Sequence, residues 1–268
     1  MSKLLYLPFM AFAYSLRWSW WMKNVYGLNV LVYHKIGYPP KDSKLKSLWV
    51  SPQRFERHIL YLKKNNYKII TFSELVNYYR NSSPINDLVL ITFDDGYENN
   101  YTYAYPLLKK YGAKGNIFVV YNTIGNVNIW HNPEGEVWQK MATRDMLLEM
   151  DKSGVIEFGS HTMNHPRLLN ISKEDARWEI FESKKQLENL FQKEMITFAY
   201  PYGSGAYDET IRKMVFDAGY LFDFSFKQGK TKWPWERGKQ PLDRLFIQYS
   251  DTIFDLNLHL KKGVAKLF

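Results

Sequence analysis

Two adjacent carboxylates, Asp94 and Asp95, are the residues of this chain whose types and spacing point most directly to chemistry. They follow the apolar run at residues 88–91, which is typical of a buried strand in a parallel sheet. Two like charges this close cannot both stay ionised unless a cation or a proton lies between them. The pair therefore predicts a metal site at the end of this strand.

Two histidines further along the chain, His161 and His165, offer additional ligands after the strand-like run at residues 155–158. Their spacing lets both imidazoles face the same way if the segment forms one helical turn. Two imidazoles and one carboxylate leave a coordination position open, as in catalytic rather than structural metal sites. Either motif alone has a more ordinary explanation, such as an Asp-Gly turn. Their occurrence together at strand ends favours a metal site.

A third strand-like run, at residues 196–199, ends in a turn that contains Pro201, Tyr202 and Gly203. Such a turn would expose backbone N–H groups, and exposed donors beside a metal can stabilise a developing oxyanion. The alternative is a plain strand-terminating turn with aromatic core residues. That alternative would be preferred if the two motifs described above were missing.

In their order and spacing, these three segments resemble the motifs of the NodB-type polysaccharide deacetylases; the matching residues are 92–96, 161–166 and 200–203. The upstream segments 31–36 and 50–56 are similar to the branch related to poly-N-acetylglucosamine deacetylases. The resemblance extends over about residues 29–248, which is most of the chain. It implies a distorted (β/α) barrel with about seven parallel strands.

The resemblance also implies a role for each matching residue. Asp94 would be the general base, and the metal ligands would be Asp95, His161 and His165. The backbone N–H of Tyr202 would help the metal to hold the oxyanion. The expected cofactor is one divalent ion, zinc or another transition metal. Such an ion would acidify a bound water and polarise the acetamide carbonyl, while Asp94 takes the proton of that water.

The chain departs from the family pattern in the position of the general acid. Many members carry this histidine in a Leu-Leu-His segment near the C-terminus, and the nearest equivalent here is His259. In the branch that this chain resembles, the acid is expected from an N-terminal Tyr-His segment, which points to His34. The apolar strand at residues 30–33 would bring His34 to the same sheet end as Asp94. His259 and the absence of any protein acid are the alternatives.

A second departure is Ala199, which stands where many members have an arginine. Arg244 could replace that arginine and orient Asp94, or it could form a surface salt bridge.

Five further residues border the predicted site or could bind sugars. Tyr97 and Pro201 are candidates for the wall of the substrate cleft. His131 reads as a plain loop histidine, although it could border the cleft. The pair Trp233 and Trp235 could stack on sugar rings or pack against the barrel.

The order of the predicted elements indicates a parallel α/β barrel. Strand-like and helix-like segments alternate along residues 30–218, which argues for repeated βαβ units. Active sites in such barrels lie at the carboxyl ends of the strands, where the proposed ligands, base and acid all fall. We expect one deacetylase domain at residues 28–250, an apolar and aromatic segment at 1–27, and a basic tail at 251–268.

The composition limits the classes of partner. The 268 residues include no cysteine, so disulfides and thiolate metal sites are excluded. The net charge of +9 favours an anionic partner or surface. Nucleic acid is not expected, because the charges are dispersed and no binding motif is present.

The N-terminal segment bears on localisation. Its apolar run at residues 4–16 is too short to span a membrane. The part before a possible cleavage site at residues 11–13 is only residues 4–10, which is short for a cleaved signal peptide. The tryptophans and basic residues at positions 17–23 are of the kind that prefers a membrane interface. The tail lysines, Lys261, Lys262 and Lys266, would add attraction to an anionic membrane surface. We therefore expect peripheral membrane association or export, with a helix packed on the barrel as the alternative for this segment.

Together with the predicted metal site, the resemblance implies metal-dependent hydrolytic removal of an N-acetyl group from an amino sugar. The expected substrate is an N-acetylated glycan or a lipid-linked sugar. A carbohydrate-binding protein on the same fold without turnover is the alternative from another functional class.

Overall fold

The structure is a computed structural model that describes residues 24–131 and 135–264. The expectations for the apolar run at residues 4–16, the tryptophan and basic cluster at 17–23 and Lys266 lie outside these residues. Within the described part, no helix has both the length and the apolar character needed to cross a membrane.

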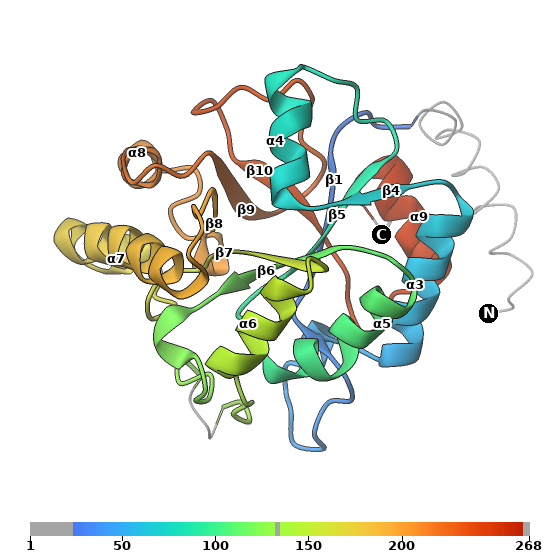
Figure 1. Ribbon diagram of the computed structural model, residues 1–268, viewed down its shortest axis with the longest axis horizontal. Helices are drawn as coiled ribbons and strands as arrows, with labels where there is room; N and C mark the ends of the chain where they lie inside the picture. The colour runs from blue at the N-terminus through green and yellow to red at the C-terminus, as the bar shows by residue number, and fades with distance from the viewer. Residues whose placement is uncertain (1–23, 132–134, 265–268) are drawn as a thin grey trace, which may run out of the picture.

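Seven parallel strands of the described chain close into a barrel (Figure 1). The ring closes where the strand Asn29–Tyr33 pairs in parallel with the strand Leu88–Phe93, from Asn29 opposite Val89 to Tyr33 opposite Phe93. The predicted distorted barrel of about seven strands is therefore confirmed. In order around the ring the strands are β1 (Asn29–Tyr33), β10 (Leu242–Phe246), β9 (Phe222–Gln228), β8 (Thr197–Ala199), β7 (Ile156–Ser160), β6 (Gly115–Val119) and β5 (Leu88–Phe93).

The barrel is distorted at its amino end by an additional strand, β4 (Lys68–Ile70). This strand pairs with the first half of β5, whereas β6 pairs with the end of β5. Helix α4 (Phe72–Arg80) follows at once, and its Phe72 packs against Phe118 and Phe224 with ring centroids 5.0 and 5.7 Å apart. An apolar core therefore fills the amino end of the barrel.

In the part of the chain that the structure describes, six other helices follow the strands and cover the outside of the barrel (Figure 1). Five of them begin after a Ser, Thr or Asp whose side chain accepts a backbone N–H of the first turn, which is why these helices start where they do. Helix α5 is the exception, because it continues from a π-helical turn. The helices are α3 (Pro52–Lys64), α5 (Tyr105–Lys110), α6 (Arg144–Lys152), α7 (Lys173–Phe191), α8 (Glu209–Asp217) and α9 (Ile253–Lys262).

Helix α9 contains most of the described part of the C-terminal segment. It lies beside α3, and the Tyr61 hydroxyl donates a hydrogen bond to Asn257 at 2.8 Å (Figure 1). His259 is buried on this helix. Trp233 and Trp235 are also buried, and both contact Tyr79, so they pack against the barrel core.

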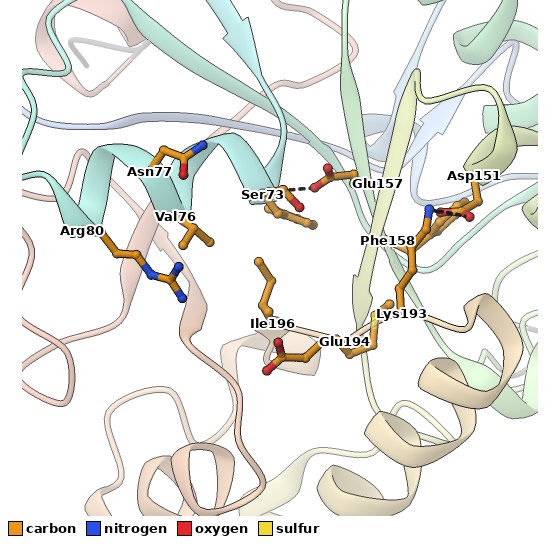
Figure 2. A pocket seen from close by; sticks show the side chains of 12 residues that line it. Ser73, Val76, Asn77, Arg80, Asp151, Glu157, Phe158, Lys193, Glu194 and Ile196 are labelled. Carbon is orange, nitrogen blue, oxygen red and sulfur yellow. Dashed lines mark hydrogen bonds and ion pairs between the residues drawn. The ribbon is translucent and has the colours of Figure 1, made fainter.

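A cavity of about 510 Å³ lies at the amino end of the barrel, between α4, the first half of β7 and the segment that leads into β8 (Figure 2). Its charged groups are partly paired: Lys193 binds Asp151 at 2.7 Å, and Glu157 accepts the backbone N–H of Ser73 at 2.8 Å. Among the described residues, the one cluster of potential metal ligands lies elsewhere, at the carboxyl end of the barrel.

Candidate active site

The residues predicted to do chemistry meet in one cavity of about 230 Å³ at the carboxyl ends of the strands. Six of the predicted residues line it: His34, Asp94, Asp95, His161, His165 and Tyr202. His131, the histidine interpreted first as a plain loop residue, lines it as well. Four lining residues were not anticipated: Leu45, Leu48, Trp130 and Phe226.

Asp95, His161 and His165 form a compact group that could hold a metal ion. The Nε2 atoms of the two histidines lie 3.5 and 3.2 Å from Asp95 Oδ1, and the ligand atoms are all within 4.8 Å of one another. The group fits a divalent cation, because Asp95 Oδ1 is buried and makes no hydrogen bond within the described residues. One carboxylate and two imidazoles are also ligands that zinc accepts.

A hydrogen bond fixes the proton position of His161. Its Nδ1 lies 2.7 Å from the carbonyl oxygen of Ala199, which can only accept. Nδ1 therefore carries the proton, and the Nε2 lone pair faces Asp95. Such a partner on the far nitrogen is the usual way in which proteins orient a metal-binding histidine. Ala199, the residue that replaces the family arginine, thus contributes its backbone to the site.

The backbone around the site is strained. Of the seven non-glycine residues with positive φ in the described chain, four belong to the site segments: Asp95 (77°), Thr162 (71°), His165 (62°) and Tyr202 (57°). The expectation that one helical turn aligns the two histidines is wrong, because positive φ at Thr162 and His165 makes a tight turn instead. Strain of this kind persists only where surrounding contacts impose it.

Glu179 of α7 supplies much of that constraint. Its carboxylate accepts hydrogen bonds from the backbone N–H groups of Met163 and Asn164 and from the Asn164 amide, at 2.7–2.9 Å. The Thr162 hydroxyl also accepts the N–H of His165 at 2.9 Å. Glu179 was not predicted as a site residue, because a glutamate within a long amphipathic helix carries no local signal of this role.

Asp94 forms a buried ion pair with Arg244. The guanidinium donates two hydrogen bonds to the carboxylate, at 2.6 and 2.8 Å, and a third to the carbonyl of Ser225 at 2.8 Å. Arg244 is 0% exposed, so it is not a surface salt bridge. Burial would raise the pKa of Asp94, but Arg244, His161 and His34 together hold it below its usual value. Asp94 is therefore ionised at neutral pH.

The two candidate acids occupy different places. His34 follows β1, lines the cavity, and has its Nε2 4.0 Å from Asp94 Oδ2. Burial lowers the pKa of His34, although Asp94 and Asp95 oppose this effect. His259 does not line the cavity: it contacts Gln228 at 3.0 Å and Asp251 at 3.4 Å.

Two predicted cleft residues do not reach the cavity surface. Tyr97 is fully buried, and its hydroxyl accepts a hydrogen bond from Asn128 at 3.3 Å. Burial and the Asp95 carboxylate raise the pKa of Tyr97 well above its usual value, so the phenol is neutral. Pro201 is buried within its turn. Tyr202, which follows it, is 38% exposed, and the Arg167 guanidinium lies 4.0 Å from its ring centroid.

Known proteins share this chain's motifs and its fold. The family model for polysaccharide deacetylases matches residues 81–222, which is more than half of the chain. The chain belongs to the polysaccharide deacetylase family. Members of this family are amide hydrolases that act on sugar polymers. The matched range includes Asp94, Asp95, His161, His165 and Tyr202 but neither His34 nor Arg244, so the case for those two residues depends on geometry.

Individual relatives within the family are moderately similar. The chain is 33% identical over 203 residues to YxkH of Bacillus subtilis, a predicted polysaccharide deacetylase, and the match covers 75% of this chain and 65% of YxkH. It is 31% identical over 195 residues to the poly-beta-1,6-N-acetyl-D-glucosamine N-deacetylase of Staphylococcus aureus, covering 70% and 64% of the two chains. The chain thus spans slightly less than two thirds of the length of these relatives.

The fold matches solved structures of the family. A polysaccharide deacetylase from Bacillus cereus superposes with a TM-score of 0.75 at 24% identity, covering 88% of this chain and 69% of that one. At this identity the likeness supports the fold, a NodB-like barrel of seven strands.

Proposed function

We propose that this protein is a metal-dependent hydrolase that removes N-acetyl groups from an amino sugar in a glycan. The observation that carries the proposal is the position of two groups in one cavity. The potential ligands Asp95, His161 and His165 lie beside a carboxylate, Asp94, that Arg244 keeps ionised. A site for a metal-bound water and a base able to deprotonate that water are the two requirements of this reaction.

In the proposed mechanism, Asp95, His161 and His165 would hold zinc or another divalent ion, which when bound would supply an acidified water and polarise the acetamide carbonyl. Asp94 accepts the proton of that water, and the pairing with Arg244 orients its carboxylate for the task. The backbone N–H of Tyr202 donates to the developing oxyanion. His34, on the wall of the same cavity, donates a proton to the leaving amine nitrogen.

The proposed substrate class is an N-acetylated polymer or a lipid-linked sugar. The Staphylococcus aureus relative is named for poly-beta-1,6-N-acetyl-D-glucosamine, which makes β-1,6-linked N-acetylglucosamine the first glycan to test. The net charge of +9 supports association with an anionic surface. Peripheral membrane association or export remains a prediction.

The test is acetate release by the full chain, loaded with zinc, from a panel of N-acetylated glycan oligomers. His161→Ala should lose stoichiometric metal, measured by elemental analysis, and all activity. Asp94→Asn should keep the metal and lose acetate release by about two to four orders of magnitude, because an amide cannot accept the proton. Asp217→Asn, on the exposed end of α8, is the matched control. Glycan binding without acetate release by the metal-loaded wild type would instead identify a carbohydrate-binding protein.

A further inference from the structure

The two histidines of the proposed metal site are held by different means. His161 Nδ1 donates to the carbonyl of Ala199. His165 Nδ1 is buried and has no hydrogen-bond partner in the described part of the chain. Because metal-binding histidines usually have a partner on the second nitrogen, the orientation of His165 must come from another contact.

That contact is an aromatic stack. The Trp130 ring lies against the His165 ring, with centroids 4.3 Å apart and planes inclined by 28°. Tyr202 meets the same imidazole in a T-shaped arrangement at 4.6 Å. Rings packed in this way restrict rotation about the Cβ–Cγ bond of the histidine, which is the motion that a hydrogen bond would otherwise prevent.

The segment that carries Trp130 is tied to a second loop over the cavity. Glu136, which is 5% exposed, accepts hydrogen bonds from the Ser43 hydroxyl at 2.7 Å and from the backbone N–H groups of Lys44 and Leu45 at 2.7 and 2.8 Å. Leu45 itself lines the cavity. We call these three hydrogen bonds the Glu136 contact. They join the loop after β6 to the loop before the short strand β3 (Trp49–Val50).

Hydrogen bonds within the loop transmit this restraint toward Trp130. The Trp138 indole N–H donates to the carbonyl of His131 at 2.5 Å. The Asn128 side chain accepts the N–H of Gln139 at 2.6 Å and contacts His131 Nδ1 at 2.9 Å. Residues on both sides of Trp130 are thus fixed to the part of the loop that contains Glu136.

We propose that Trp130 is the positioning residue for His165, replacing the missing hydrogen bond, and that the Glu136 contact holds Trp130 in place. Metal affinity then depends on the packing of a loop that also forms the wall of the substrate cavity. This inference rests on the metal site of the proposed function. It assigns Trp130 a role in metal retention and not in proton transfer.

The test measures zinc affinity of the full chain by competition with a chromophoric chelator. Trp130→Ala and Trp130→Leu should each weaken zinc binding about tenfold or more, the usual loss when a ligand's supporting contact is removed. Trp130→Phe, which can still stack, should stay near the wild type. Glu136→Ala should weaken binding by a smaller factor. Trp178→Ala, at a half-exposed tryptophan on α7, is the control and should change nothing.

A second readout reports geometry. The visible absorption of the cobalt-substituted protein should change in Trp130→Leu and remain unchanged in Trp130→Phe, because the band responds to ligand arrangement. Wild-type zinc affinity and a wild-type spectrum in Trp130→Leu would overturn the inference. A side chain that fills the space without stacking would then be enough to position His165. A wild type that binds no divalent ion would instead refute the metal site of the proposed function, and the inference with it.

Discussion

The two ends of the barrel are built from the same strands, but the side chains that point into the barrel differ between them. Near the amino end β1 and β5 contribute Val30 and Leu90 to an apolar core, while beyond their carboxyl ends lie His34 and Asp94. Strand β10 changes from Leu242 to Arg244 within two residues. The charged site therefore rests on an apolar floor. In such surroundings a paired charge interacts strongly and an unpaired charge is costly.

The largest effect on turnover in this comparison is expected for His34→Ala at the carboxyl end. Loss of a general acid should reduce kcat by about two to four orders of magnitude and leave metal content unchanged. Since burial lowers the pKa of His34, the wild type should lose kcat/KM as pH rises through a value below about 6.5. That alkaline limb should be absent from the variant.

His259→Ala is the control for this prediction and should keep the wild-type kcat and pH profile. An inactive His259 variant together with an active His34 variant would reverse the assignment of the acid.

A smaller effect on turnover is expected for Arg244→Met, which removes the cation paired with Asp94. Burial, no longer opposed by Arg244, should raise the pKa of Asp94, and a base must be ionised. The acidic limb of kcat/KM should therefore move to higher pH. Breaking the buried pair should also lower the free energy of unfolding by about 3–5 kcal/mol, measured by chemical denaturation.

Arg212→Met provides the matched comparison. Arg212 forms a similar buried pair with Asp223, at 2.9 Å, and neither residue lines the cavity. This variant should lose a comparable amount of stability without moving the pH profile. An equal shift of the acidic limb in both variants would show that it follows from the loss of stability and not from the loss of the cation beside Asp94.

The smallest effect on turnover is expected at the amino end. Phe72→Ala should lower the free energy of unfolding by about 3–5 kcal/mol, because it leaves a cavity in the apolar core. Its kcat at a temperature where the protein is fully folded should stay within about twofold of the wild type. A loss of kcat as large as that of His34→Ala would mean that the two ends are not independent.

Much of the strand and helix order follows from the sequence, because apolar runs and helix-starting residues alternate regularly. Strand β9 escaped prediction: Phe222–Gln228 alternates aromatic and polar residues, unlike the continuous apolar runs typical of buried parallel strands. The alternation also fails after β9, since no helix separates it from β10 in the described chain.

The sequence predicts the site residues that come directly after a strand. It does not predict those that depend on contacts between loops. Asp94, Asp95 and His161 are positioned by their own strands. Trp130 and Glu136 are positioned by contacts between distant loops, such as the hydrogen bond from Ser43 to Glu136 across 93 positions of sequence. No local pattern encodes such a contact. Arg244 combines the two situations: it lies on a strand, but its ion pair with Asp94 depends on how the barrel closes.

Closure of the barrel by β10 also has a consequence for synthesis. Asp94 and Arg244 are 150 positions apart, so at translation rates of 5–20 residues per second Arg244 is synthesised roughly eight to thirty seconds after Asp94. Until β10 is made, β1 and β9 are open edges that can pair with other chains. The nascent protein must therefore pass through an interval of exposed strands and an uncompensated carboxylate. Synthesis of β10 supplies the missing neighbour of both strands and the cation for Asp94.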